Sequence, residues 1–261
     1  DIRSALEEAA TQREPGCGQG TEDYPAPRLV GISKTKSAEC LQNAYDAGLR
    51  VFGENYVHEI VEKAPKLPSD IEWHFVGHLQ SNKVKTILSA VPALAVLETV
   101  DSTKLADKLN KGCADYRGGR PPLKVYVQVN TSGEESKSGV EPGQTMIDLA
   151  RHIVDKCPNL SFAGLMTIGM PDYTSKPENF ECLWKCRDEV SSALGISPVH
   201  KLELSMGMSG DFANAVRMGA TNVRVGSKIF GARNYGSPSQ TSSASSMAST
   251  TPMTPATPLK E

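Results

Sequence analysis

A lysine follows a short apolar segment near the amino terminus, and its amine is the first candidate for chemistry in this chain. Residues 28–34 read RLVGISK, a pattern typical of a strand buried on both faces. Side chains alternate along a strand, so Val30, Ile32 and Lys34 share one face, where an ammonium group is costly. A lysine that loses its proton there can form a Schiff base with an aldehyde. The alternative is that Lys34 only ends the strand and extends to water.

Two turns of small residues near the carboxyl terminus favour an anion. Residues 205–211 read SMGMSGD and residues 226–231 read GSKIFG. Each turn offers backbone N–H groups ahead of a helix, and Ser209 adds a hydroxyl. One such turn alone is most often a helix cap. Two of them on successive strands, the second beginning with Gly226 and Ser227, predict a phosphate site.

A ligand with a phosphate at one end and an aldehyde at the other would join the turns to the lysine. Pyridoxal 5'-phosphate (PLP) has that form. Arg224 would then lie near the pyridine nitrogen, where a permanently charged guanidinium donates a hydrogen bond and keeps that nitrogen unprotonated. The alternative interpretation of Arg224 is a salt bridge to Glu54 or Glu203.

A regular alternation of strands and helices must position these residues. Eight strands alternating with helices favour a parallel α/β fold, and eight strands in ~250 residues are typical of a closed (β/α)8 (TIM) barrel. An open doubly wound sheet would carry a glycine-rich turn after its first strand, but residues 33–36 read SKTK. The strands are expected at residues 28–34, 49–53, 71–76, 93–100, 123–130, 160–167, 199–205 and 222–226, and the helices at 2–13, 38–47, 56–63, 80–89, 102–114, 144–156, 177–194 and 211–218.

The composition excludes several classes of function. The 261 residues are 39% hydrophobic and 22% charged, with a formal net charge of -2, which gives no general attraction for nucleic acid or anionic membranes. No apolar run reaches the ~20 residues that span a bilayer, and the charged amino terminus lacks a signal-peptide core, so we expect a cytoplasmic protein. The six cysteines form no Cys-x-x-Cys pair, and Cys182 and Cys186 are interpreted as reduced thiols, so no metal site is expected.

Six motifs resemble those of the pyridoxal phosphate homeostasis protein family, also called the YggS or proline synthetase co-transcribed family. They are VGISKTK at residues 30–36, FGENY at 52–56, HFVGHLQSNK at 74–83, GLMT at 164–167, LSMGMSGD at 204–211 and VRVGSKIFG at 223–231. The resemblance covers residues 28–233 in the family's motif order. It implies a single barrel similar to the amino-terminal domain of alanine racemase, with PLP bound to Lys34.

The resemblance also implies which residues hold the phosphate and the ring. Ser209, Gly226 and Ser227 match the positions that bind the phosphate, and Arg224 matches the arginine that faces the ring nitrogen. Many relatives carry threonine where this chain has Ser227, so the hydroxyl is kept.

Three further residues are expected in the cofactor site. Asn55 and His78 match pocket positions of the family, and Ser205 is added at the end of the seventh strand. Lys36 is the alternative Schiff-base lysine. It is ranked below Lys34 because it shares the parity of Lys34 only if the strand continues past the barrel rim.

The expected organisation is an amino-terminal helix and loop packed on the barrel (1–27), the PLP-binding barrel (28–236) and a Ser/Thr/Pro-rich tail without order (237–261). The resemblance implies a carrier or regulator that holds PLP reversibly, serves vitamin B6 homeostasis and passes PLP to PLP-dependent client enzymes, as a monomer or alternatively a dimer. The competing hypothesis is a PLP-dependent amino-acid racemase. Racemisation needs a base on each face of the substrate carbanion, and no sequence feature places Tyr56 or Tyr173 opposite Lys34, so the carrier is favoured.

Overall fold

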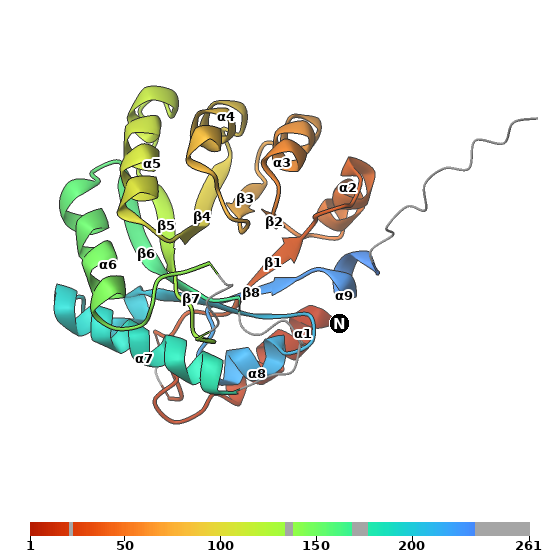
Figure 1. Cartoon of the computed structure of the whole chain (residues 1–261). Coiled ribbons are helices and arrows are strands. Elements are labelled where there is room, and N and C mark those ends of the chain that lie inside the picture. The colour runs from red at the N-terminus through yellow and green to blue at the C-terminus, as the bar shows by residue number, and fades with distance from the viewer. Residues whose placement is uncertain (21–22, 134–137, 169–176, 233–261) are drawn as a thin grey trace, which may run out of the picture.

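The computed structural model describes residues 1–20, 23–133, 138–168 and 177–232. Its eight parallel strands pair in sequence order, and β1 also pairs with β8, so the sheet closes into a barrel (Figure 1). This confirms the predicted (β/α)8 barrel. The strands are β1 (Arg28–Ile32), β2 (Val51–Glu54), β3 (Glu72–Phe75), β4 (Leu94–Val100), β5 (Leu123–Gln128), β6 (Leu160–Met166), β7 (Glu203–Met208) and β8 (Asn222–Val225).

Amphipathic helices cover the outside of the barrel (Figure 1). In α4, for example, Val84, Ile87 and Leu88 are buried at helical spacing, while Lys85 and Ser89 face solvent. The helices are α1 (Ile2–Thr11), α2 (Ala38–Asp46), α3 (Val57–Lys63), α4 (Val84–Ala90), α5 (Thr103–Tyr116), α6 (Gln144–Lys156), α7 (Pro177–Leu194), α8 (Phe212–Arg217) and α9 (Ser227–Phe230), with 3₁₀ turns η1 (Ala64–Lys66), η2 (Ser81–Lys83) and η3 (Val199–Lys201).

The first strand is shorter than the sequence predicts. It ends at Ile32 rather than at Lys34. The backbone N–H of Lys36 donates to the carbonyl of Ser33 (3.1 Å) and closes a tight turn, with Thr35 at a left-handed φ of 64°. Lys34 therefore lies in a turn at the barrel rim, and the prediction that it is the last strand residue is wrong.

The seventh strand is shifted toward the carboxyl terminus. Residues 199–201, expected to begin the strand, form η3, and β7 runs from Glu203 to Met208. The strand extends into the expected glycine-rich turn because Met208 pairs with Arg224 of β8 across an irregularity in the ladder. This extension carries the turn after β7 up to the level of the barrel mouth.

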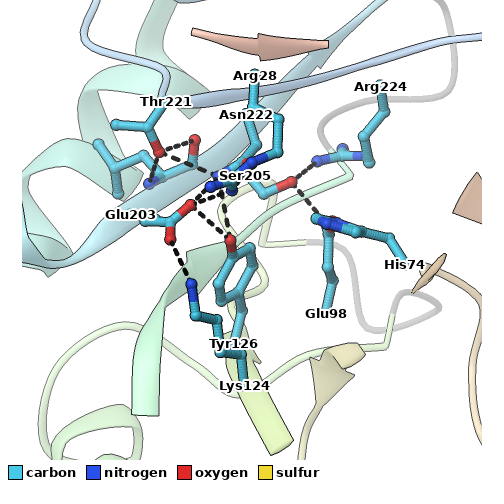
Figure 2. Close-up of polar contacts among 11 residues, drawn as sticks. Arg28, His74, Glu98, Lys124, Tyr126, Glu203, Ser205, Thr221, Asn222 and Arg224 are labelled. Atoms are coloured by element: carbon cyan, nitrogen blue, oxygen red, sulfur yellow. Dashed lines mark hydrogen bonds and ion pairs between the residues drawn. The ribbon is translucent and has the colours of Figure 1, made fainter. Parts of the chain in front are cut away.

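A charged layer lies inside the amino-terminal half of the barrel (Figure 2). The carboxylate of Glu203 on β7 accepts hydrogen bonds from Tyr126 on β5 and Asn222 on β8, both at 2.8 Å. It also pairs with Arg28 on β1 at 2.5 Å. Because side chains from strands on opposite sides of a closed barrel can meet only in its interior, this layer replaces part of the usual aliphatic filling.

The segment before the barrel packs on its outside. Leu6 and Ala9 of α1 are buried against the core, and the backbone N–H of Glu14 donates to the carbonyl of Arg217 at the end of α8 (2.8 Å). The predicted tail, 237–261, lies outside the described residues. Within the described ranges, no helix has both the length and the apolar character needed to cross a membrane.

Candidate functional site

A cavity of about 600 Å³ opens at the carboxyl ends of the strands. The loops after β1, β7 and β8 bound it, and these are neighbours in the closed barrel although β1 lies far from the other two in sequence. Most of the predicted site residues line this cavity: Lys34, Asn55, Ser209, Arg224, Gly226 and Ser227.

Lys34 lines this cavity from the turn after β1, and its side chain is partly exposed. Lys36 lines the same cavity, and its Nζ donates to the carbonyl of Ala232 (2.7 Å). Both lysines lie beyond the end of β1, so strand parity does not separate them as the sequence argument assumed. Both candidate Schiff-base lysines therefore line the site, and Lys36 is hydrogen-bonded to the segment after α9.

The turns after β7 and β8 are joined to each other. The hydroxyl oxygen of Ser209 accepts a hydrogen bond from the backbone N–H of Gly226 (3.1 Å). A side chain at Gly226 would bring its Cβ within 3.3 Å of the carbonyl oxygen of Ile32, so glycine allows the second turn to lie close to β1. Ser227 begins α9, and the first N–H groups of a helix have no acceptor within it. The paired turns can therefore bind an anion.

Arg224 on β8 reaches the floor of the cavity and is only 5% exposed. Its Nη1 donates to the hydroxyl of Ser205 and its Nη2 to the carbonyl of Thr167, both at 2.6 Å. Burial lowers the pKa of this guanidinium. Among the described residues, neither Glu54 nor Glu203, the two alternative partners, bonds to it.

A buried carboxylate supports Arg224 through the serine (Figure 2). Ser205 donates its hydroxyl proton to Oε2 of Glu98, and Oε1 of Glu98 is bonded to Nδ1 of His74, both at 2.5 Å. Burial alone would raise the pKa of Glu98, but His74, Arg224 and Ser205 outweigh it, and the pKa is lowered. Glu98 therefore stays ionised at neutral pH and balances the charge of Arg224 below the cavity.

Two predicted residues lie outside the cavity lining. Ser205 is fully buried below it and acts through Arg224. His78 lines a second cavity of about 600 Å³, shared with Asn55 and Tyr56. Its side chain is 58% exposed, and its Nδ1 lies 3.4 Å from a carboxylate oxygen of Asp101. The role of His78 in binding stays a prediction.

Three residues near the site were missed by sequence reasoning. Glu98 lies inside an otherwise apolar strand, and a charge in such a strand needs a buried partner. That partner is His74 on β3. Lys228, directly after Ser227, lines the cavity and adds a positive charge beside the turns. For Glu98 and His74, the signal available in the sequence was Glu98 itself, the one charged residue in the strand segment 94–100.

One group of described side chains has donor atoms that suit a metal ion. It lies between α5 and α6 on the outside of the barrel, away from the cavity. Asp107, His152 and Cys157 bring their ligand atoms within 4.8 Å of one another. His152 Nε2 is already bonded to Asp107 Oδ1 at 2.7 Å. Burial raises the pKa of the Cys157 thiol to about 11, so the thiol keeps its proton at neutral pH. The absence of a metal stays a prediction.

Comparison with known sequences relates this chain to one domain family and one group of proteins. Residues 25–234 match the family model described as alanine racemase, N-terminal domain. A relative from Homo sapiens, named pyridoxal phosphate homeostasis protein, is 53% identical over 223 residues, which cover 82% of this chain and 80% of that protein. A protein of the same name from Haemophilus influenzae is 39% identical over 228 residues, 85% of this chain and 92% of that protein.

Solved structures give the same relation. PipY of Synechococcus elongatus, solved with PLP bound, is 31% identical, with a TM-score of 0.66 over 88% of this chain and 100% of PipY. An alanine racemase of Clostridium difficile is 16% identical, with a TM-score of 0.63 over 92% of this chain and 57% of the racemase. The likeness to the racemase therefore concerns the fold alone.

Proposed function

Because this chain belongs to the pyridoxal phosphate homeostasis protein family and carries the alanine racemase amino-terminal domain, we propose that it binds PLP and takes part in PLP homeostasis. The cofactor occupies the cavity at Lys34, which holds its aldehyde as a Schiff base. The proposed recipients of the cofactor are PLP-dependent enzymes. The monomeric state and the cytoplasmic location stay predictions.

One observation carries the proposal, which is the single cavity that joins Lys34 to the paired turns. Its volume of about 600 Å³ lies within the ~300–1,000 Å³ typical of small-molecule sites. The donors suit the cofactor, since an amine is present for the aldehyde, and N–H groups with the Ser209 hydroxyl are present for the phosphate. The residues of this structure therefore fit PLP.

Arg224 supports holding the cofactor over running a reaction with it. PLP supplies an electron sink in enzymes, and a protonated pyridine nitrogen strengthens that sink. A guanidinium at this nitrogen donates a hydrogen bond and opposes its protonation. The racemase alternative needs a second base, yet Tyr56 lines the other cavity and Tyr173 lies outside the described residues.

The test is to locate the modified lysine. The purified protein incubated with PLP should absorb as a protonated imine, and Lys34→Ala should lose this absorption because no amine remains at that position. Lys36→Ala, the matched control, should keep it. Borohydride reduction followed by peptide mass spectrometry should find the adduct on Lys34. An adduct on Lys36, or an imine that persists in Lys34→Ala, would overturn the assignment.

A further inference from the structure

A buried ammonium group lies directly behind the Lys34 turn. Lys63, the last residue of α3, is only 7% exposed, and its Nζ contacts Oε1 of Glu54 at the end of β2 (2.8 Å). It also pairs with Glu59 one turn earlier on α3, and it donates to the carbonyl of Ser33 (2.9 Å). Lys63, Glu54 and Glu59 are called the Lys63 cluster below.

The Lys63 cluster binds both residues that flank Lys34. On one side, the hydroxyl of Ser33 donates to Oε1 of Glu54 (2.7 Å), while the carbonyl of Ser33 accepts from Lys63. On the other side, the backbone N–H of Thr35 donates to Oε2 of Glu59 (2.8 Å). The backbone before and after Lys34 is therefore fixed by side chains from β2 and α3.

This fixation matters because the turn is not one that its sequence adopts easily. Thr35 has a φ of 64°, and a β-branched residue in the left-handed region is uncommon. Such a conformation persists where the surrounding structure determines it. The hydrogen bond from Thr35 to Glu59 and the bonds at Ser33 supply that determination.

We propose that the Lys63 cluster positions the Lys34 turn so that its amine meets the aldehyde of a ligand bound at the paired turns. The inference rests on the proposed function and adds Lys63 as a positioning residue for Schiff-base formation. Lys63 is not among the residues that line the cavity, and it acts through the backbone of Ser33 and through the carboxylates of Glu54 and Glu59.

Charge explains why Lys63 is the central member of the cluster. Burial raises the pKa of Glu54, while the ammonium of Lys63 and the hydroxyl of Ser33 act to lower it. Glu59 adds a second carboxylate to the same small volume. Without Lys63, the two carboxylates would face each other with no cation between them, and the contacts to Ser33 and Thr35 would rearrange.

The experiment separates positioning from binding by using two ligands on the full chain. Lys63→Met is compared with the wild type and with Lys66→Met, in which an exposed pair to Glu62 (2.9 Å) is lost instead. The rate of imine formation with PLP is followed by absorbance. The affinity for pyridoxine 5'-phosphate, which has the phosphate and ring but no aldehyde, is measured by calorimetry.

Lys63→Met should form the imine at least ~10-fold more slowly, because small displacements of a reacting group cost rate. Its affinity for pyridoxine 5'-phosphate should stay within about twofold of the wild type, since the paired turns are unchanged. Lys66→Met should match the wild type in both measurements. A wild-type rate in Lys63→Met, or a loss of affinity for pyridoxine 5'-phosphate as large as the loss of rate with PLP, would overturn the inference.

Glu59 provides a second route if Lys63→Met does not fold. Glu59→Ala removes the acceptor of the Thr35 N–H and should slow imine formation, whereas Glu59→Gln keeps an oxygen at that place and should restore part of the rate. Equal wild-type rates in both variants would overturn the inference while leaving the proposed function intact. A wild-type protein that forms no imine would overturn the proposed function itself, and the inference with it.

Discussion

Arg224 brings a permanent charge into a buried position, and its partners explain how that position is tolerated. Transfer of a guanidinium from water to a protein interior costs roughly several kcal/mol. Hydrogen bonds and an opposite charge can offset this cost. The Thr167 carbonyl and the Ser205 hydroxyl supply the hydrogen bonds, and ionised Glu98 supplies the charge. The guanidinium is thereby fixed at the cavity floor.

Truncating this residue should alter the bound cofactor. In Arg224→Ala the absorption maximum of the imine should shift, and PLP should leave about 10-fold faster or more, because a hydrogen bond from a charged donor is lost. Absorbance spectra and stopped-flow release measure both effects. Arg120→Ala, which removes an exposed arginine bonded to the Pro92 carbonyl, is the control. An unchanged spectrum and an unchanged release rate would show that Arg224 does not contact the pyridine ring of the cofactor.

At the scale of single residues, the sequence predicted the cavity-lining residues that lie at or near the carboxyl ends of the strands. Lys34, Ser209 and Arg224 were identified from their types and positions, and all three line the cavity. Glu98 and His74 were not identified, because one sequence does not show that Glu98 meets His74 on the neighbouring strand and Ser205 on β7 inside the barrel. His78 was predicted from a motif and lines a different cavity.

At the scale of elements, the site depends on two turns that hold each other. The hydrogen bond from the Gly226 N–H occupies the Ser209 oxygen as acceptor, which leaves the hydroxyl proton of Ser209 to be donated elsewhere. A phosphate at the paired turns is the acceptor that the proposed function requires. Ser209 therefore joins the two turns, and under the proposed function its hydroxyl also donates to the phosphate.

Removing this hydroxyl should weaken phosphate binding specifically. In Ser209→Ala the dissociation constant for PLP should rise about tenfold or more, since a hydrogen bond to a charged group is worth ~1.5–3 kcal/mol. Imine formation with pyridoxal, which has no phosphate, should be unaffected. Ser89→Ala, which removes an exposed hydroxyl bonded to the Lys85 carbonyl in α4, should bind both ligands normally. Equal losses for PLP and pyridoxal would contradict a phosphate role.

The elements themselves were largely predictable, and the exceptions have local causes. Apolar strands and amphipathic helices alternate strongly enough to give the barrel. The boundaries failed where a hydrogen bond outside the pattern decides the conformation. The Lys36 to Ser33 bond ends β1 early, and the pairing of Met208 with Arg224 extends β7 into residues expected to form a loop.

At the scale of the whole molecule, the charged layer around Glu203 ties the first strand to the last ones. Arg28 on β1 and Asn222 on β8 bond the same carboxylate oxygen, as does Tyr126 from across the barrel. Burial alone would raise the pKa of Glu203, but Arg28, Asn222 and Tyr126 outweigh it and lower this pKa. The layer therefore stabilises closure of the barrel through an ionised group.

This shift predicts how stability depends on pH. A carboxyl group whose pKa is lowered by folding stabilises the folded state above the ordinary carboxyl pKa of ~4.3. That contribution is lost as the pH falls through the lowered value. Glu203→Gln should therefore reduce the free energy of unfolding at pH 7 by about 1 kcal/mol, because the pair with Arg28 is only partly buried and solvent screens the charge that remains.

Urea denaturation at pH 7 and near pH 3 measures the free energy of unfolding of the wild type and of Glu203→Gln. The gap in unfolding free energy between Glu203→Gln and the wild type should narrow in acid, because Glu203 takes up a proton more readily in the unfolded wild type than in the folded one. Glu62→Gln, which loses only an exposed pair with Lys66, should leave stability nearly unchanged at both values. A gap that stays constant with pH would exclude charge as the origin of the stabilisation.

The pairing of β1 with β8 has a consequence for the newly made chain. Lys34 emerges from the ribosome early, whereas the turns after β7 and β8 are synthesised only after the rest of the barrel. A growing or prematurely terminated chain carries the amine without the anion-binding half of its pocket. A reactive aldehyde would therefore be retained only by chains whose synthesis has passed the turn after β8.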